Sequence, residues 1–327
     1  MRWPLTTLLL LVCSLTATAA LQSKYSDAGL TVDGYLCVDA TTGAVLAEKS
    51  PDNPGHPASV TKLMTLLLVL EDIQAQHATL KQSVKITRPA VGVGGSQVWL
   101  ATGETFTLEE LLFALMLPSA NDAAVALAID RAGSTAAFVT RMNQRAAALG
   151  MTRTHYVTPN GYTLGIGPHD TTTARDLSKL CLVLCQLPEA LRFTGTKTYA
   201  FHHPKQTLAL ENHNHLLQDF PGCDGLKTGW TVAGKASIAT TAHDGNRRVI
   251  AIVLGCDSPQ GAKAAQRLRD QLAGELMTDG LTKLAQQSAE KERLLAQAKI
   301  ECKPLAATTI PAKETSFWDW LKDLFSF

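Results

Sequence analysis

The stretch Ser59-Val-Thr-Lys-Leu-Met-Thr-Leu-Leu-Leu-Val-Leu70 begins where a loop gives way to a long apolar run. The loop, residues 51–57, is rich in Pro, Asn, Asp and Gly, and the run predicts a helix from about Ser59 to Gln76. Residues three apart on a helix share a face, so the hydroxyl of Ser59 and the amine of Lys62 can meet. A helix start also presents free backbone N–H groups, which suit a negatively charged oxygen.

A serine hydroxyl becomes a nucleophile when a base stands beside it. Lysine can be that base when its amine is neutral, and burial or a second nearby cation lowers the lysine pKa far enough. Ser59 and Lys62 are therefore candidate catalytic residues. Their spacing alone also fits a helix cap followed by a solvated lysine, so other parts of the chain must decide.

Two further short motifs follow along the chain. Ser119-Ala-Asn121 comes after Pro118 in a helix-rich section. Its hydroxyl and amide could relay a proton and hold a substrate carbonyl, or could cap the next helix. Lys227-Thr-Gly229 stands just before a predicted strand. There lysine adds positive potential, threonine can bond a carboxylate and glycine lets substrate approach a strand edge, although a plain turn uses the same residues.

Strands are predicted at both ends of the chain and helices in its middle. Residues 34–39 and 44–48 have the pattern of a hairpin, and so do residues 235–241 and 248–256. The section from about 108 to 149 is predicted to be helical. This order favours the α+β class with a mainly antiparallel sheet.

Taken together, the three motifs resemble the low-molecular-mass penicillin-binding proteins that act as serine D-alanyl-D-alanine carboxypeptidases, peptidase family S11. The likeness covers roughly Ser26 to Gln286, and it extends to the segments His56-Pro-Ala-Ser-Val-Thr-Lys62, Leu117-Pro-Ser-Ala-Asn-Asp-Ala-Ala124, Thr171-Thr-Thr-Ala-Arg-Asp176, Asn212-His-Asn-His-Leu216 and Asp224-Gly-Leu-Lys-Thr-Gly-Trp-Thr231. The resemblance implies a β-lactamase/transpeptidase-like fold, in which helices flank an antiparallel sheet and an all-helical subdomain is inserted at about residues 85–155.

The resemblance also implies a role for each motif residue. Ser59 attacks the carbonyl between the two terminal D-alanines of a peptidoglycan stem peptide, Lys62 accepts its proton, and Ser119 with Lys227 protonates the leaving amine. The implied substrate-binding residues are Asn121, Lys227, Thr228, Gly229, Trp230 and Thr231. The N–H groups of Ser59 and Trp230 would form the oxyanion hole. Water then hydrolyses the acyl-enzyme, and β-lactam antibiotics acylate Ser59 stably. This cell-wall chemistry requires no cofactor and no metal.

The chain departs from the family pattern in two places. Family members often place an arginine just after the strand that follows Lys-Thr-Gly, whereas this chain has Asp257-Ser-Pro-Gln-Gly-Ala-Lys263. Lys263 could contact the substrate carboxylate there, but a point charge is not a bidentate fork. Many relatives also carry a second, β-rich domain, for which residues 287–312 are too few. We therefore expect a catalytic domain over residues 21–286 and a helical stalk over 287–312.

Both ends of the chain resemble targeting segments. Residues 1–20 combine Arg2, a short apolar run and Ala17-Thr-Ala19, as in a secretory signal peptide, although a retained anchor has similar features. Residues 313–327 can wind into an amphipathic helix with an aromatic face, which suits either a membrane interface or the protein's own surface. We expect an exported protein, peripherally anchored at the extracytoplasmic face of the cell membrane.

Two other functions remain open for this fold. A β-lactamase needs fast deacylation, usually through a glutamate in an irregular loop, and the corresponding segment from Tyr156 to Asp176 contains no glutamate. A non-catalytic cell-wall binding protein could share the fold, but its motifs would not need to be intact.

Composition excludes several other classes of protein. The formal net charge of +1 gives no reason to expect nucleic acid as a partner. The histidine pairs at 202–203 and 213/215 lack one-turn helical spacing and nearby carboxylates, so no metal site is predicted. Beyond Cys13 in the leader, six cysteines remain, and their spacing leaves disulfides and buried thiols equally open.

Overall fold

The computed structural model describes residues 31–163, 167–204 and 206–301. The expected signal peptide over residues 1–20 and the expected amphipathic helix over 313–327 lie outside these residues. Residues 31–284 form one compact unit, and a second unit begins at Ala285.

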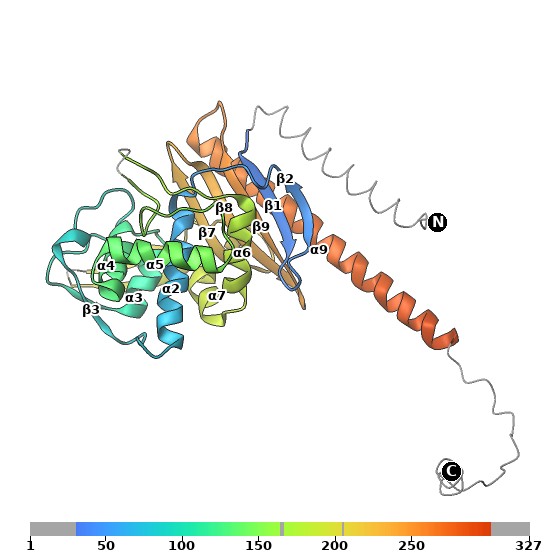
Figure 1. Ribbon diagram of the computed structural model, residues 1–327, viewed down its shortest axis with the longest axis horizontal. Coiled ribbons are helices and arrows are strands. Elements are labelled where there is room, and N and C mark those ends of the chain that lie inside the picture. Colours follow the sequence, from blue (N-terminus) through green and yellow to red (C-terminus); the bar gives the residue numbers. More distant parts are fainter. Residues whose placement is uncertain (1–30, 164–166, 205, 302–327) are drawn as a thin grey trace, which may run out of the picture. The chain divides into compact units, whose positions relative to one another are not determined.

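The centre of the compact unit is a five-stranded antiparallel sheet, as expected from the strand patterns at the two ends of the chain (Figure 1). Across the sheet the strands run in the order β2 (Val45–Lys49), β1 (Gly34–Asp39), β9 (Arg247–Cys256), β8 (Lys235–Asp244) and β7 (Cys223–Thr231). The predicted hairpin of β8 and β9 is confirmed, with Asp244 opposite Arg247 at its turn. Strand β7 is one edge of the sheet, and its outward backbone groups have no neighbouring strand.

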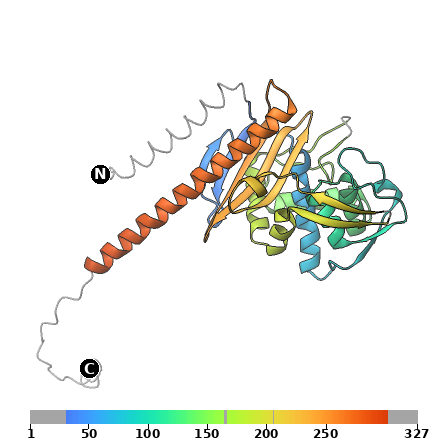
Figure 2. The same cartoon turned by 180° about the vertical axis from the view of Figure 1, so that it is seen from behind.

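Both faces of the sheet are covered by apolar side chains. Because successive strand residues point to opposite faces, Leu36 and Ile252 belong to the larger core, whereas Cys37 and Val253 belong to the smaller one. The larger core takes in α6 (Ala174–Cys185) and α7 (Pro188–Gly195). The first part of α9 (Ala262–Glu301) crosses the other face of the sheet (Figure 2).

The middle of the chain is largely helical, as predicted. Its elements are the 3-10 helix η1 (Ala58–Thr61) and the helices α2 (Lys62–Gln74), α3 (Leu108–Met116), α4 (Asn121–Ala132) and α5 (Thr135–Ala148). Two short ladders and two minor elements complete it: β3 (Ser83–Lys85) with β4 (Thr105–Thr107), β5 (Thr198–His203) with β6 (Gln206–Glu211), the 3-10 helix η2 (Arg88–Ala90) and α8 (Leu216–Asp219). The inserted region thus carries a β-ladder besides its helices.

The structure also answers the question left open for the cysteines, within the part of the chain that it describes. Cys37, Cys181, Cys185, Cys223 and Cys256 are free thiols, and Cys302 is outside that part. Burial raises the pKa of the Cys37 and Cys256 thiols to about 12, so both are protonated and unreactive. Among residues 31–163, 167–204 and 206–301, no helix combines the length and apolarity needed to cross a bilayer.

Candidate active site

Ser59 lies in η1, immediately before α2, and not in the α-helix predicted to begin there. The preceding residue, Ala58, has a φ of 49°, which is unfavourable for a residue with a side chain. Its carbonyl is met so closely by Gly161 that a Cβ at Gly161 would lie 1.8 Å from the oxygen. Backbone strain of this kind persists only where surrounding structure imposes it, and it is concentrated at functional sites.

Lys62 is fully buried and has three polar partners. Its Nζ lies 2.9 Å from the Ser59 Oγ, 2.8 Å from the Asn121 Oδ1 and 2.8 Å from the carbonyl oxygen of Asn160. Burial, and then the positive charge of Lys227, lower the pKa of Lys62 well below its usual value. A neutral amine here would donate to Asn121 and Asn160 and accept from the Ser59 hydroxyl. The alternative of a solvated lysine after a helix cap is therefore wrong.

Asn121 is the first residue of α4 and joins three parts of the site. Its side chain accepts from Lys62 and donates to the carbonyl of Gly94 at 2.8 Å, and its backbone N–H donates to Ser96 at 2.7 Å. Ser119 is 4% exposed, has a φ of 63°, and its Oγ has no hydrogen-bond partner among the residues that the structure describes. Neither side chain caps α4, so the capping alternative for this motif is also wrong.

The Lys-Thr-Gly motif lies inside β7, not before a strand as the sequence suggested. Lys227 is 2% exposed and makes one hydrogen bond, to the neighbouring carbonyl of Thr228 at 3.1 Å. Burial, and then the charge of Arg269, lower the pKa of Lys227 to about 7. A buried ammonium with so few partners and the unpaired Ser119 hydroxyl are polar groups that a bound substrate could satisfy.

Gly229 lies directly against the turn that carries Ser59. A Cβ there would lie 2.6 Å from the carbonyl of Pro57 and 2.9 Å from the backbone nitrogen of Ser59. The missing side chain therefore makes room for the turn that carries Ser59. The neighbouring Trp230 is 44% exposed, and the hydroxyl of Thr231 accepts from the N–H of Gly234 at 2.8 Å in the turn to β8.

Lys263, the expected carboxylate contact, is exposed in the first turn of α9 and forms no hydrogen bond or ion pair with the residues that the structure describes. A different cation, Arg269, is buried in the second turn after it. Arg269 donates to the carbonyl of Ser237, which pairs with Gly229 across β7 and β8. Sequence reasoning did not identify Arg269, because nothing in its local pattern distinguishes it from a solvated helix arginine.

Asp170 organises the irregular segment that supplies the Asn160 carbonyl. One carboxylate oxygen accepts from the backbone N–H groups of Val157 and Thr158, and the other accepts from the hydroxyls of Thr61 and Thr158. The Thr158 hydroxyl in turn accepts from the N–H of Gly161 at 2.7 Å. With both oxygens occupied, Asp170 is a structural carboxylate and is poorly suited to activating water for fast deacylation.

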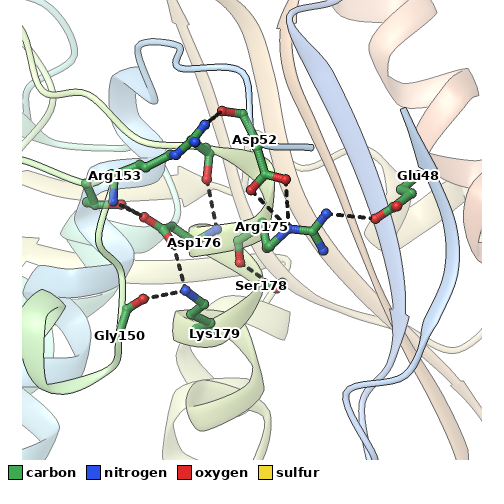
Figure 3. A network of polar contacts seen from close by, with 10 residues as sticks. Glu48, Asp52, Gly150, Arg153, Arg175, Asp176, Ser178 and Lys179 are labelled. Carbon is green, nitrogen blue, oxygen red and sulfur yellow. Dashed lines mark hydrogen bonds and ion pairs between the residues drawn. The ribbon is translucent and has the colours of Figure 1, made fainter. Parts of the chain in front are cut away.

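The loop before Ser59 is tied to α6 by a network of polar contacts (Figure 3). Arg175 contacts the carboxylates of Asp52 and Glu48, and Asp176 accepts from the backbone of Arg153 and from Lys179. Gly55 and Thr172 exchange two backbone hydrogen bonds between the same segments. Residues 171–176 therefore help to hold the loop that precedes Ser59.

The chain is similar to several known proteins. A family model described as D-alanyl-D-alanine carboxypeptidase matches residues 21–258. The D-alanyl-D-alanine carboxypeptidase DacF of Bacillus subtilis is 34% identical over 70% of this chain, which spans 58% of DacF. A D-alanyl-D-alanine endopeptidase of Pseudomonas aeruginosa is 36% identical over 67% of this chain and 71% of its own length. The crystal structure of penicillin-binding protein D2 of Listeria monocytogenes in the ampicillin-bound form has a TM-score of 0.66 and 29% identity, covering 76% of this chain and 96% of that one.

Proposed function

Because the chain belongs to the D-alanyl-D-alanine carboxypeptidase family of serine peptidases, we propose that it removes the terminal D-alanine from peptidoglycan stem peptides through an acyl-enzyme on Ser59. The contact between the Lys62 amine and the Ser59 hydroxyl, at 2.9 Å, is the observation that carries the proposal. The lowered pKa of Lys62 supports it, because the amine can then be neutral at the pH of the reaction.

In the acylation step the neutral amine of Lys62 takes the hydroxyl proton as the Ser59 Oγ attacks the carbonyl carbon between the two D-alanines. The negative charge that develops on the carbonyl oxygen is stabilised by the N–H groups of Ser59 and Trp230. The proton passes by way of Ser119 to the amine of the departing D-alanine as the peptide bond breaks. The Ser119 hydroxyl supports this role, since no group in the described part of the chain competes for it.

Substrate is held by groups on both sides of Ser59. We assign the terminal carboxylate to Lys227 and Thr228, and the amide before the scissile bond to Asn121. Gly229, Trp230 and Thr231 continue the edge of β7, along which an extended peptide can lie. Lys263 would add positive potential from the start of α9. If Lys263→Ala leaves KM unchanged, Lys263 does not contact the substrate.

Water completes the reaction by hydrolysing the ester of Ser59. A β-lactam ring is opened by the same attack, but its leaving group stays attached, so the acyl-enzyme persists. Slow release of that adduct distinguishes the proposed enzyme from a β-lactamase, which would turn over a chromogenic cephalosporin rapidly and without a burst.

The direct test uses the mature chain, residues 21–327, and a diacyl-lysyl-D-alanyl-D-alanine tripeptide. We expect the wild type to release D-alanine and the Ser59→Ala variant to release none and to take up no fluorescent penicillin. No release by either protein, with no labelling of Ser59, would favour the non-catalytic binding protein.

An endopeptidase activity is the second candidate, and the similarity to the Pseudomonas aeruginosa endopeptidase favours it. A cross-linked muropeptide dimer separates the two activities, because cleavage of the cross-link yields two monomers without free D-alanine.

We also propose an exported protein with a catalytic domain over residues 21–286, a helical stalk over 287–312 and a membrane-anchor helix over 313–327. The support is the leader pattern of residues 1–20 and the aromatic face of the last segment. Co-sedimentation with phospholipid vesicles should be seen for residues 21–327 and lost for residues 21–312.

A further inference from the structure

Trp99 has an exposed side chain that no part of the proposed chemistry uses. Its side chain is 72% exposed, although indoles are highly buried on average. Its φ of 63° places a bulky residue in the left-handed region, which is uncommon and costs free energy. An exposed indole and a left-handed backbone both cost free energy, so they persist only where the surrounding structure imposes them.

The surrounding structure does impose them. The buried carboxylate of Asp122 accepts the backbone N–H of Val98 at 3.2 Å and that of Leu100 at 3.1 Å. Both of these neighbours are buried, at 2% and 3% exposed. The carbonyl of Trp99 itself lies 3.3 Å from the His203 Nε2. The backbone on both sides of Trp99 is therefore held in place, and its indole is exposed to solvent.

The same loop is part of the active site. Asn121 donates from its side chain to the carbonyl of Gly94 and from its backbone to that of Ser96, and it also accepts from Lys62. The anchor of Trp99, Asp122, is the next residue of α4. Gly95 also lies against the Asn121 side chain, since a Cβ at Gly95 would be 2.6 Å from the Asn121 Nδ2. Trp99 follows Gly95 by four positions, so their Cα atoms are at most about 14 Å apart. Because Lys62 contacts both Ser59 and Asn121, and Asn121 contacts Gly94, we expect a substrate longer than two D-alanines to reach from Ser59 to the indole.

We propose that Trp99 is an outer substrate subsite that stacks on a sugar ring of peptidoglycan, the part of the substrate beyond the stem peptide. The residues from Val91 to Leu100 carry no charge, which suits a neutral ring better than an ionic group. The electron-rich face of an indole attracts the polarised C–H groups on the flat side of a pyranose. This inference rests on the proposed function and extends its substrate from a peptide to a glycopeptide.

The test compares two substrates with the same scissile bond: a free pentapeptide, and the pentapeptide carried by its disaccharide. In the Trp99→Gly variant, kcat/KM for the disaccharide pentapeptide should fall about fivefold to tenfold, as expected for loss of one aromatic contact. The value for the free pentapeptide and the rate of penicillin acylation should not change. Trp99→Phe should retain most of the preference. Glycine tolerates a φ of 63°, so the melting temperature of Trp99→Gly should not fall.

An equal loss on both substrates, or no loss on either, would overturn the subsite. Unchanged kinetics together with lost vesicle binding would instead assign the indole to a lipid surface, and would also overturn it. If the wild type cleaves neither substrate, the proposed function is overturned. The subsite is then tested by ligand binding alone. In that case the disaccharide should quench tryptophan fluorescence in the wild type and not in Trp99→Phe, and absence of that difference would reject the proposal.

Discussion

The backbone of Gly229 in β7 lies against the backbone of Ser59 in η1, so closely that a methyl group on Gly229 would come within 2.9 Å of the Ser59 nitrogen. Because Gly229 has no side chain, the edge strand β7 can lie directly against the turn that carries Ser59. Any side chain at this position must displace the turn that carries Ser59.

Gly229→Ala should therefore reduce the rate of acylation by a fluorescent penicillin about 100-fold, because a displacement near 1 Å costs roughly that factor. Gly274→Ala is the matched control, since its Cβ would meet nothing closer than 3.7 Å and α9 favours alanine over glycine. We expect the control to acylate normally and to melt at the same temperature or higher. Normal acylation of Gly229→Ala would contradict the packing argument.

The acylation rate should depend on pH through Lys227. Because the pKa of Lys227 is about 7, its ammonium is present below that pH and is lost as the pH rises through it. The value of kcat/KM for the tripeptide, which reports the free enzyme, should fall on the alkaline side with an apparent pKa near 7. Lys227→Arg keeps its charge and should remove that limb while lowering the maximal rate. An alkaline limb retained in Lys227→Arg would assign it to another group.

The same lysine should make the protein less stable than a variant without it. Below pH 7 the folded and unfolded chains both carry the proton, and the folded chain bears the full cost of a buried charge. Between about 7 and 10.5 the unfolded chain binds more protons, so stability rises with pH. Lys227→Met should unfold with a free energy up to about 5 kcal/mol higher than wild type at pH 6. The difference should shrink towards pH 10, and urea denaturation at both pH values measures it.

Asp170 should stabilise the folded protein because its carboxylate accepts hydrogen bonds from several donors. Asp170→Ala leaves two backbone N–H groups and two hydroxyls without their acceptor, so it should cost about 3 kcal/mol of unfolding free energy or more. Acylation should slow as well, because the Asn160 carbonyl that contacts Lys62 belongs to the same segment. In Asp170→Asn the amide oxygen can keep the N–H groups while both hydroxyls rotate to accept, so the loss should be about 1 kcal/mol. Equal effects of the two variants would argue against this account.

Arg175 and Asp176 are neighbours in Figure 3, but they should contribute differently to the free energy of unfolding. The ion pairs of Arg175 are open to water, with 36% of its own side chain and 47% of the Asp52 side chain exposed, so Arg175→Ala should cost less than about 1 kcal/mol. Asp176 is 3% exposed and accepts a backbone N–H. Asp176→Ala should cost about 2 to 3 kcal/mol, because that donor is left unpaired. Thermal unfolding of the two variants side by side gives the comparison.

Local sequence patterns predicted the regular elements where they were strong. The apolar run after Ser59 became α2, and the β8–β9 hairpin formed around its predicted turn. The strand β7 was not predicted, because Gly225 and Gly229 interrupt the alternation that marks a strand. Its strand state comes from pairing with β8, which a local pattern does not record.

The sequence by itself determined the fold class and the family, and it predicted Ser59, Lys62, Asn121 and Lys227 as site residues, because short motifs record residue types and their spacing. Only the tertiary structure decided how these groups meet. It brought the Asn160 carbonyl to Lys62, gave Gly229 a packing role against the turn of Ser59, and buried Lys227 nearly without partners. The first two features arise from backbone atoms of residues 98 to 172 positions apart, and such contacts leave no signature in a local stretch of sequence.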